Sequence, residues 1–266
     1  MTAPSELVEF AVHLADIAAA EILPHFRTDL GIENKAAQDS DQRRYDPVTI
    51  ADRDAEAAVR REIRRVYPQH GIQGEEHGLE RGTSEYTWLI DPIDGTRSFV
   101  LGQLHWGTLI ALATARPLIG VMRQPYTGET FLGHAGGTEL RRFDAVTKLT
   151  ARRSTRLEDA CVCATDPGML DSPQRRAAFD RLVQRARSMR YGGDCYTPCL
   201  VAAGCADLVV EAGLKPWDVA ALVPIVEGAG GVITDWTGRH PAGDDMVIAA
   251  NRALHAQVIE ALAWSR

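Results

Sequence analysis

Apolar side chains recur at helical spacing in two segments near the start of the chain. The first segment follows Ser5, a suitable N-cap, and runs to about Pro24. The second opens at Asp46 and keeps one apolar stripe until Pro68 stops it. The polar stretch 31–45 between them has no period and is expected to be a loop. The pattern therefore predicts two helices joined by a loop.

Short apolar runs after the second helix predict strands. Two of them, 72–76 and 88–91, are expected to end in acids. Because Pro92 lacks a backbone N–H and restricts the residue before it, we expect the strand to stop at Asp91 and the chain to turn there. Four further runs over 106–143, separated by Pro and Gly, predict a β-meander. These elements indicate an α+β half with antiparallel strands.

Strands and helices alternate in the rest of the chain. A Thr- and Arg-rich stretch at 145–156 has no apolar period and is the expected boundary between two halves. Beyond it, strands are predicted over 160–164, 188–191, 207–211, 232–235 and 246–249, and helices over 172–186, 194–204, 217–227 and after Asn251. Alternation of this kind indicates an α/β half. We therefore expect an α+β half over residues 1–150 and an α/β half over residues 151–266.

The composition is that of an ordinary globular protein. The chain has 266 residues, of which 45% are hydrophobic and 24% charged, and its formal net charge is −7. This negative charge argues against nucleic acid or an anionic membrane as the main partner, so a small molecule is expected. No apolar run is long enough to span a bilayer, and the first residues do not resemble a signal peptide, so a cytoplasmic location is expected. The five cysteines form no zinc pattern and are expected to be reduced and buried.

Candidate chemistry lies in the segment 88–99, which carries two acids three residues apart. Asp91 and Asp94 offer carboxylates for cations, while Gly95 and Thr96 offer close backbone approach and donors for an anion. By itself, this Asp-Pro-x-Asp-Gly sequence could also be an ordinary surface turn. A calcium loop of the EF-hand type fits less well, because it needs acids at every second position.

Several acids lie at the predicted ends of strands and helices: Asp46, Glu75, Asp91, Asp94 and Asp218. If they converge, each pair at about 4 Å repels by roughly 4 kcal/mol at an effective dielectric constant near 20. They would then have to bind protons or cations, and an all-oxygen set suits Mg²⁺. Asp52 and Glu56 are interpreted instead as acids that stabilise the helix dipole.

Several sequence blocks together resemble the inositol monophosphatase superfamily of Mg²⁺-dependent, lithium-sensitive phosphatases. The blocks are Gly74-Glu75-Glu76, the segment from Trp88 through Asp91-Pro92-Ile93-Asp94-Gly95-Thr96 to Phe99, Trp217-Asp218-Val219-Ala220 and Gly230-Gly231. The resemblance implies a five-layer αβαβα fold, a homodimer, and hydrolysis of small phosphate monoesters. It also implies two or three Mg²⁺ ions in each active site, possible use of Mn²⁺, and inhibition by Li⁺.

The resemblance also implies roles for individual residues. The metal ligands would be Glu75, Asp91, the Ile93 carbonyl, Asp94 and Asp218. Asp94, Gly95 and Thr96 would bind the phosphate. Asp46, Thr49, Glu75 and Thr96 would serve catalysis, with the two threonines orienting the attacking water.

The segment from Tyr191 to Tyr196, together with the segments 106–109 and 211–218, resembles the histidinol-phosphatase branch, which acts in histidine biosynthesis. Inositol-cleaving members typically carry uncharged residues here, whereas this chain has Asp194. Histidinol phosphate carries an ammonium and an imidazole, and charge-assisted hydrogen bonds to Asp194 or Glu211 are chemically sensible. Both acids are therefore expected to bind the substrate, although Asp194 could also be only a helix N-cap.

Other functions fit the same sequence. One is an inositol-1-phosphate or broad sugar-phosphate phosphatase of the same fold. Another is a regulatory protein that uses the scaffold without catalysis, since fold does not guarantee activity. A phosphatase for 3′-phosphoadenosine compounds fits less well, because the chain has no extra basic insert for a second phosphate.

Overall fold

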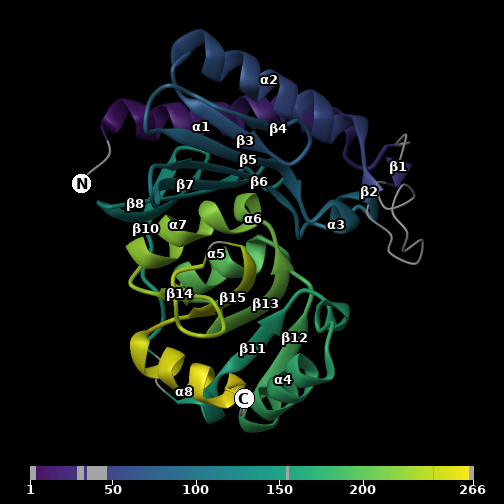
Figure 1. Ribbon diagram of the computed structural model, residues 1–266, viewed down its shortest axis with the longest axis vertical. Helices are drawn as coiled ribbons and strands as arrows, with labels where there is room; N and C mark the ends of the chain where they lie inside the picture. Colours follow the sequence, from purple (N-terminus) through teal and green to yellow (C-terminus); the bar gives the residue numbers. More distant parts are fainter. Residues whose placement is uncertain (1–3, 29–32, 35–46, 154–155, 242, 264–266) are drawn as a thin grey trace.

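The computed structural model describes residues 4–28, 33–34, 47–153, 156–241 and 243–263. These residues form five layers, in the order helices, eight-stranded sheet, helices, five-stranded sheet, helices (Figure 1). The predicted mixed α/β class with αβαβα layers is confirmed. No helix among the described residues is long and apolar enough to cross a membrane.

The first layer contains α1 (Ser5–Ile22) and α2 (Ile50–Val66), which pack against each other. Both predicted helices are confirmed, and the apolar stripe of α1 is buried against the sheet. Ser5 is not the N-cap, because that position is taken by Pro4 and Ser5 is the first helical residue. A short 3-10 helix, Leu23–His25, follows α1. Most of the predicted loop at 31–45 lies outside the described residues.

The second layer is the eight-stranded sheet, ordered β10-β9-β8-β7-β6-β5-β3-β4. Its strands are β3 (Gly71–Gly74), β4 (Gly78–Glu80), β5 (Thr87–Asp94), β6 (Gly107–Ala113), β7 (Pro117–Gln124), β8 (Glu129–His134), β9 (Gly137–Arg142) and β10 (Ala145–Lys148). The predicted meander is confirmed. β3 and β5 are parallel and the other pairs are antiparallel. A separate small sheet pairs β1 (Glu33–Asn34) with β2 (Pro47–Val48).

In this part of the chain one strand was not predicted and one strand end was predicted wrongly. β10 lies in the stretch expected to be the boundary, where its backbone pairs with β9 although its side chains are exposed and show no apolar period. β5 does not stop at Asp91 but continues to Asp94, with a shift in its pairing to β6 between these two residues. The irregularity accommodates Pro92, whose carbonyl accepts a 2.8 Å hydrogen bond from the Thr108 hydroxyl.

The five-stranded sheet forms the fourth layer, ordered β12-β11-β13-β15-β14. Its strands are β11 (Cys161–Ala164), β12 (Ser188–Tyr191), β13 (Leu208–Leu214), β14 (Val232–Thr234) and β15 (Asp244–Ala249). α4 (Pro173–Arg185) and α8 (Arg252–Leu262) contact each other and form the last layer, while two 3-10 helices, Leu157–Asp159 and Pro167–Met169, lie in the connections. The predicted strands and outer helices are confirmed to within a few residues.

Helices α5 (Tyr196–Ala202), α6 (Pro216–Ala220) and α7 (Leu222–Gly228) form the middle layer. The helix predicted over 217–227 is two helices, because Pro224 has no N–H to donate to the carbonyl four residues earlier. The helix expected to begin at Asp194 begins at Tyr196.

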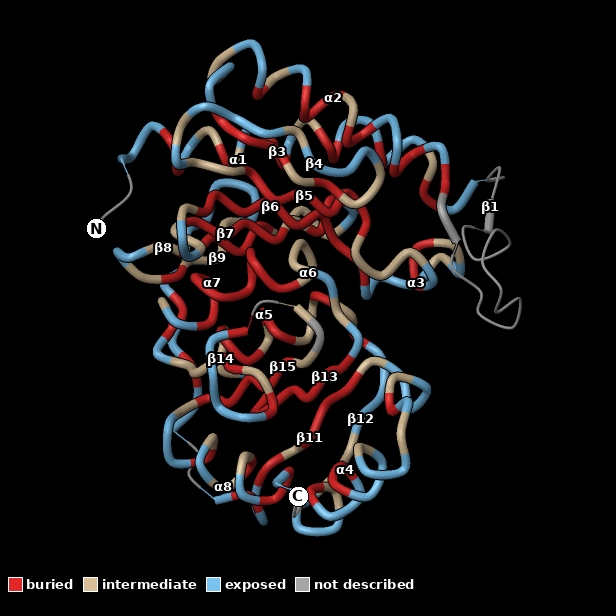
Figure 2. Tube along the Cα trace, viewed as in Figure 1, coloured by how far each residue is buried: buried red, intermediate tan, exposed pale blue. Residues whose placement is uncertain are grey.

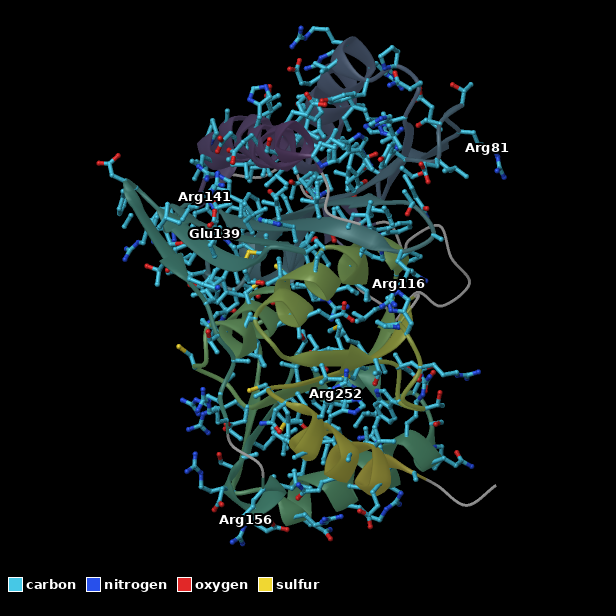
Figure 3. All side chains as sticks on the ribbon, turned by 90° about the vertical axis from the view of Figure 1, so that its left-hand side faces the viewer. Arg81, Arg116, Glu139, Arg141, Arg156 and Arg252 are labelled. Carbon is cyan, nitrogen blue, oxygen red and sulfur yellow. The ribbon has the colours of Figure 1, made fainter. Side chains whose placement is uncertain are left out.

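The two sheets are joined through this middle layer, which is buried (Figure 2). A Cβ at Gly120 would lie 1.9 Å from the Ala221 carbonyl oxygen, and one at Gly133 would lie 2.3 Å from the Ile225 nitrogen. Glycines in β7 and β8 therefore allow α7 to pack directly on the larger sheet. Arg116 pairs with Glu227 of α7 at the surface. Arg141 of β9 pairs with Glu139 on the same strand (Figure 3). The division at residues 150 and 151 remains a prediction.

All five cysteines are free thiols. Cys163, Cys195 and Cys199 are buried as expected, Cys161 is partly buried, and Cys205 is exposed. The expectation of burial is therefore wrong for Cys205.

Candidate active site

Three carboxylates from two elements converge where the larger sheet meets the middle helices. Asp91 and Asp94 come from β5, and Asp218 comes from the first turn of α6. One oxygen from each of these residues lies within 4.8 Å of the other two. Asp218 is held in place by its own helix, since its Oδ2 accepts a 2.8 Å hydrogen bond from the Lys215 backbone N–H. The arrangement forms a carboxylate cluster of Asp91, Asp94 and Asp218.

The cluster is costly to ionise without a cation. Burial, reinforced by the negative charge of Glu75, raises the pKa of Asp91 well above its usual value. Burial and the Asp218 charge do the same for the pKa of Asp94, and burial raises the pKa of Asp218 to about 7. Within the described part of the chain, Asp91 Oδ1 is buried without a hydrogen-bond partner. A hard divalent cation such as Mg²⁺ fits this all-oxygen set, because it would neutralise the charges and supply that missing partner.

Glu75 approaches the cluster from the end of β3. Its backbone N–H donates to the Ile90 carbonyl at 3.2 Å, and its charge raises the pKa of both Asp91 and Asp218. The carboxylate of Glu75 is not among the three that converge within 4.8 Å. Glu75 therefore lies beside the carboxylate cluster rather than within it.

Glu56 holds the turn that carries Glu75. Its carboxylate accepts hydrogen bonds from the backbone N–H groups of Glu76 (2.7 Å) and His77 (3.2 Å), and it pairs with Arg60 at 2.7 Å. A Cβ at Gly74 would lie 2.0 Å from Glu56 Oε1, so only glycine leaves room for the carboxylate. The helix-dipole interpretation is wrong for Glu56, which is fully buried beyond the first turn. The i,i+4 spacing of Glu56 and Arg60 was the signal available in the sequence.

Thr49 and Asp52 form a capping box at the start of α2. The Thr49 backbone N–H and hydroxyl donate to Asp52 Oδ2 at 2.8 and 2.6 Å. Asp52 is 2% exposed, and its charge reaches Asp91 and contributes to the raised pKa there. The helix-dipole interpretation therefore describes only part of what Asp52 does. Asp46 lies outside the described residues.

The turn after β5 is shaped by Gly95. This residue has φ +86° and is the N-cap of the short helix α3 (Thr96–Val100). The Thr96 hydroxyl donates to the Ile93 carbonyl at 3.0 Å, so one lone pair of that carbonyl and those of the hydroxyl remain available. Ile93 is fully buried, and its carbonyl lies in the chain between Asp91 and Asp94.

A cavity of about 820 Å³ adjoins the carboxylate cluster and includes residues from both halves of the chain. Asp94, Gly95 and Asp218 line it, together with Asp194 and Glu211. The structure thus brings both acids predicted to bind substrate into one cavity with the predicted metal ligands Asp94 and Asp218 and with Gly95 of the predicted phosphate site.

Glu211 is anchored inside this cavity. The backbone N–H and hydroxyl of Thr165 donate to Glu211 Oε1 at 2.8 and 2.9 Å. Burial raises the pKa of Glu211 to about 8 in spite of these two hydrogen bonds. A cation in the cavity would favour the ionised carboxylate.

Asp194 is not a helix N-cap, because Cys195 holds the N-cap position of α5. Its φ of +38° is unusual for a residue other than glycine. Its Oδ2 accepts a 2.8 Å hydrogen bond from the Ser98 hydroxyl, and burial raises its pKa. Ser98 was not singled out from the sequence, since its contact with Asp194 depends on tertiary structure.

Comparison with known proteins identifies the family of the chain. The model of the Inositol monophosphatase family matches residues 3–265. The Arabidopsis thaliana protein named Bifunctional phosphatase IMPL2, chloroplastic, is 37% identical, with 98% of this chain and 77% of that protein covered. A Histidinol-phosphatase from Chlorobaculum parvum is 34% identical, with 96% of each chain covered. A Nus factor SuhB from Xylella fastidiosa is 33% identical over 84% of this chain and 85% of its own.

Solved structures show the same fold. An inositol monophosphatase from Zymomonas mobilis matches with a TM-score of 0.83 and 34% identity, covering 98% of this chain and 99% of its own. The Thermotoga maritima IMPase matches with a TM-score of 0.82 and 26% identity, covering 97% and 96%. The chain therefore belongs to the inositol monophosphatase family, a family of phosphatases.

Proposed function

We propose that this protein is a Mg²⁺-dependent phosphatase that hydrolyses histidinol phosphate to histidinol and phosphate. The convergence of Asp91, Asp94 and Asp218 within 4.8 Å carries the proposal of a metal-dependent reaction. Relatives named Histidinol-phosphatase, from Chlorobaculum parvum and Streptomyces coelicolor, support the choice of substrate.

Asp91, Asp94 and Asp218 would hold Mg²⁺, with Glu75 and the Ile93 carbonyl as further ligands. When bound, the metal would acidify a water, bind the phosphate oxygens and neutralise the leaving alkoxide. The orphaned oxygen of Asp91 and the raised pKa values of the cluster support this assignment. Two or three ions at each site, use of Mn²⁺ and inhibition by Li⁺ are proposed from the family.

The chain itself orients the reacting groups. The positive φ of Gly95 turns the backbone so that Gly95 and Thr96 can present N–H groups to the phosphate. Because the Thr96 hydroxyl already donates to Ile93, its free lone pairs can accept a proton of the attacking water. Thr49 can accept in the same way, since its own proton is committed to Asp52. We propose a supporting role for Asp46 from the family alone.

Asp194 and Glu211 would recognise the positively charged groups of histidinol phosphate. Asp194 is half-buried and Glu211 is buried, and burial raises the pKa of each, so that a cation which pairs with either carboxylate offsets the cost of its ionisation. An inositol ring has no positive group to offer. We also propose a homodimer located in the cytoplasm.

An inositol-1-phosphate or broad sugar-phosphate phosphatase is the second candidate, favoured by the similarity to the Zymomonas mobilis inositol monophosphatase. Relatives named Nus factor SuhB favour a third candidate, a regulatory protein that does not depend on hydrolysis.

Phosphate release from a panel of monoesters, with and without Mg²⁺, tests all three. We expect kcat/KM to be highest for histidinol phosphate, to be lower for inositol 1-phosphate and to vanish with a chelator. A preference for inositol 1-phosphate would support the second candidate. Absence of hydrolysis for every monoester in the panel, with Mg²⁺ bound, would contradict the proposal and favour the third.

A further inference from the structure

Asp194 lies directly against the turn that we assign to the phosphate. A Cβ added to Gly95 would lie 3.0 Å from both Cβ and Cγ of Asp194, and 2.7 Å from the His105 carbonyl oxygen. Glycine at position 95 therefore allows the Asp194 side chain to approach the turn closely. A cation held by Asp194 would sit next to the phosphate group rather than at the distant end of a substrate.

Ser98 fixes the Asp194 carboxylate in this position. Among the described residues, the hydrogen bond that this carboxylate accepts comes from the Ser98 hydroxyl, at 2.8 Å. Ser98 is 8% exposed and lies on α3, two positions after Thr96. One carboxylate oxygen thus accepts the Ser98 hydroxyl, and the second oxygen is the one that we assign to a substrate cation. The nearby Arg97 acts on the same carboxylate, so the substrate cation would share its negative charge.

The two sides of this hydrogen bond differ in how they are held. Phe99, next to Ser98, is fully buried, with its ring 4.9 Å from Trp106 and 5.4 Å from Phe26 between centroids, so α3 is anchored in the core. Asp194, by contrast, follows two glycines with φ of +88° and +120° and has φ +38° itself. Because this backbone conformation is rarely adopted by a residue with a side chain, the hydrogen bond from the well-anchored Ser98 contributes to holding the Asp194 carboxylate in place.

We infer that Ser98 is a positioning residue which holds Asp194 for an ammonium group on the carbon next to the phosphoester CH₂. The inference rests on the proposed function, because histidinol phosphate has this arrangement. It defines the substrate class as phosphate esters of 2-amino alcohols. Glu211, which Thr165 holds elsewhere in the cavity, would then bind the imidazole of histidinol phosphate.

The test compares Ser98→Ala with wild type on two esters. One is histidinol phosphate and the other is its analogue without the amino group, 3-(imidazol-4-yl)propyl phosphate. For Ser98→Ala we expect KM for histidinol phosphate to rise roughly ten-fold with kcat retained, because one hydrogen bond to a charged group is lost. KM for the analogue should not change. Ser98→Thr should restore the wild-type KM, because it keeps the hydroxyl, and Ser188→Ala, away from the cavity, should behave as wild type.

Equal KM changes for the two esters, or none, would overturn the inference. So would a fall in kcat on both esters that Ser98→Thr fails to rescue. If Ser98→Ala does not fold, Ser98→Cys replaces it, since its thiol is a weak donor of similar size. Failure of the proposed function is a separate result, because wild type would then hydrolyse neither ester.

Discussion

The backbone N–H of Cys195 donates a 2.9 Å hydrogen bond to Oδ1 of Asp94. Asp94 ends β5 of the larger sheet, and Cys195 precedes α5 in the middle layer. This bond joins two parts of the chain that are 101 positions apart at a member of the carboxylate cluster. The geometry of the cluster therefore depends on how the two sheets pack.

Asp94→Asn should abolish Mg²⁺-dependent phosphate release, with a loss of roughly 10²-fold or more in kcat. Asparagine keeps an oxygen for the Cys195 N–H but removes a charge that a cation needs. In a chelator, the variant should have a higher Tm than wild type, because one of three mutually repelling acids is gone. Asp180→Asn, at an exposed position of α4, is the control and should change neither quantity. Near-normal turnover by Asp94→Asn would refute the assignment.

Glu56→Gln should weaken both the fold and metal binding. The buried pair with Arg60 and the acceptor for two backbone N–H groups would be disturbed, so we expect the free energy of unfolding to fall by about 3 kcal/mol. Because Glu56 holds the turn carrying Glu75, the Mg²⁺ concentration for half-maximal activity should rise. Glu62→Gln, which weakens the pairs with the exposed Arg65 and with His13, should change the free energy of unfolding far less, because solvent screens both pairs. An unchanged Mg²⁺ requirement would limit Glu56 to stability.

Gly95→Ala and Gly230→Ala form a matched pair, since both glycines have φ +86°. Each alanine should cost about 1–2 kcal/mol of stability for its left-handed backbone. The added Cβ of Gly95→Ala would also clash with the His105 carbonyl and crowd Asp194. No atom lies within 4 Å of a Cβ built at Gly230. We therefore expect a larger fall in Tm and loss of phosphate release for Gly95→Ala alone. Equal losses of activity would exclude a special role for this turn.

Glu211 should make the stability of the ligand-free protein depend on pH. Its pKa is raised from 4.5 to about 8, so the folded state retains a proton that the unfolded state releases. The Glu211 proton contributes its full share to the free energy of unfolding below pH 4.5. This stabilisation is lost as the pH rises to about 8. Thermal melts of wild type and Glu211→Gln across this range measure it, and the variant should show a smaller decrease. Parallel curves for the two proteins would contradict the shift.

Local patterns were sufficient where neighbouring residues decide the structure. The apolar stripes of α1 and α2 predict their own burial, and Ser172 and Asn251 each cap the helix that follows them. Predictions failed where backbone pairing or a distant contact decides the structure. β10 forms because β9 lies beside it, and the continuation of β5 past Pro92 depends on its pairing with β6.

By itself, the sequence determined the fold class, the acids offered for a metal and the family, because these follow from periodicity and from residue blocks that are local in the chain. Only the tertiary structure decided which carboxylates come together. It also decided that Glu56 holds the turn of Glu75 and that Ser98 holds Asp194. The physical reason is that a hydrogen bond needs its donor and acceptor within about 3 Å. Whether residues as distant in sequence as Ser98 and Asp194 reach that distance depends on how the layers pack.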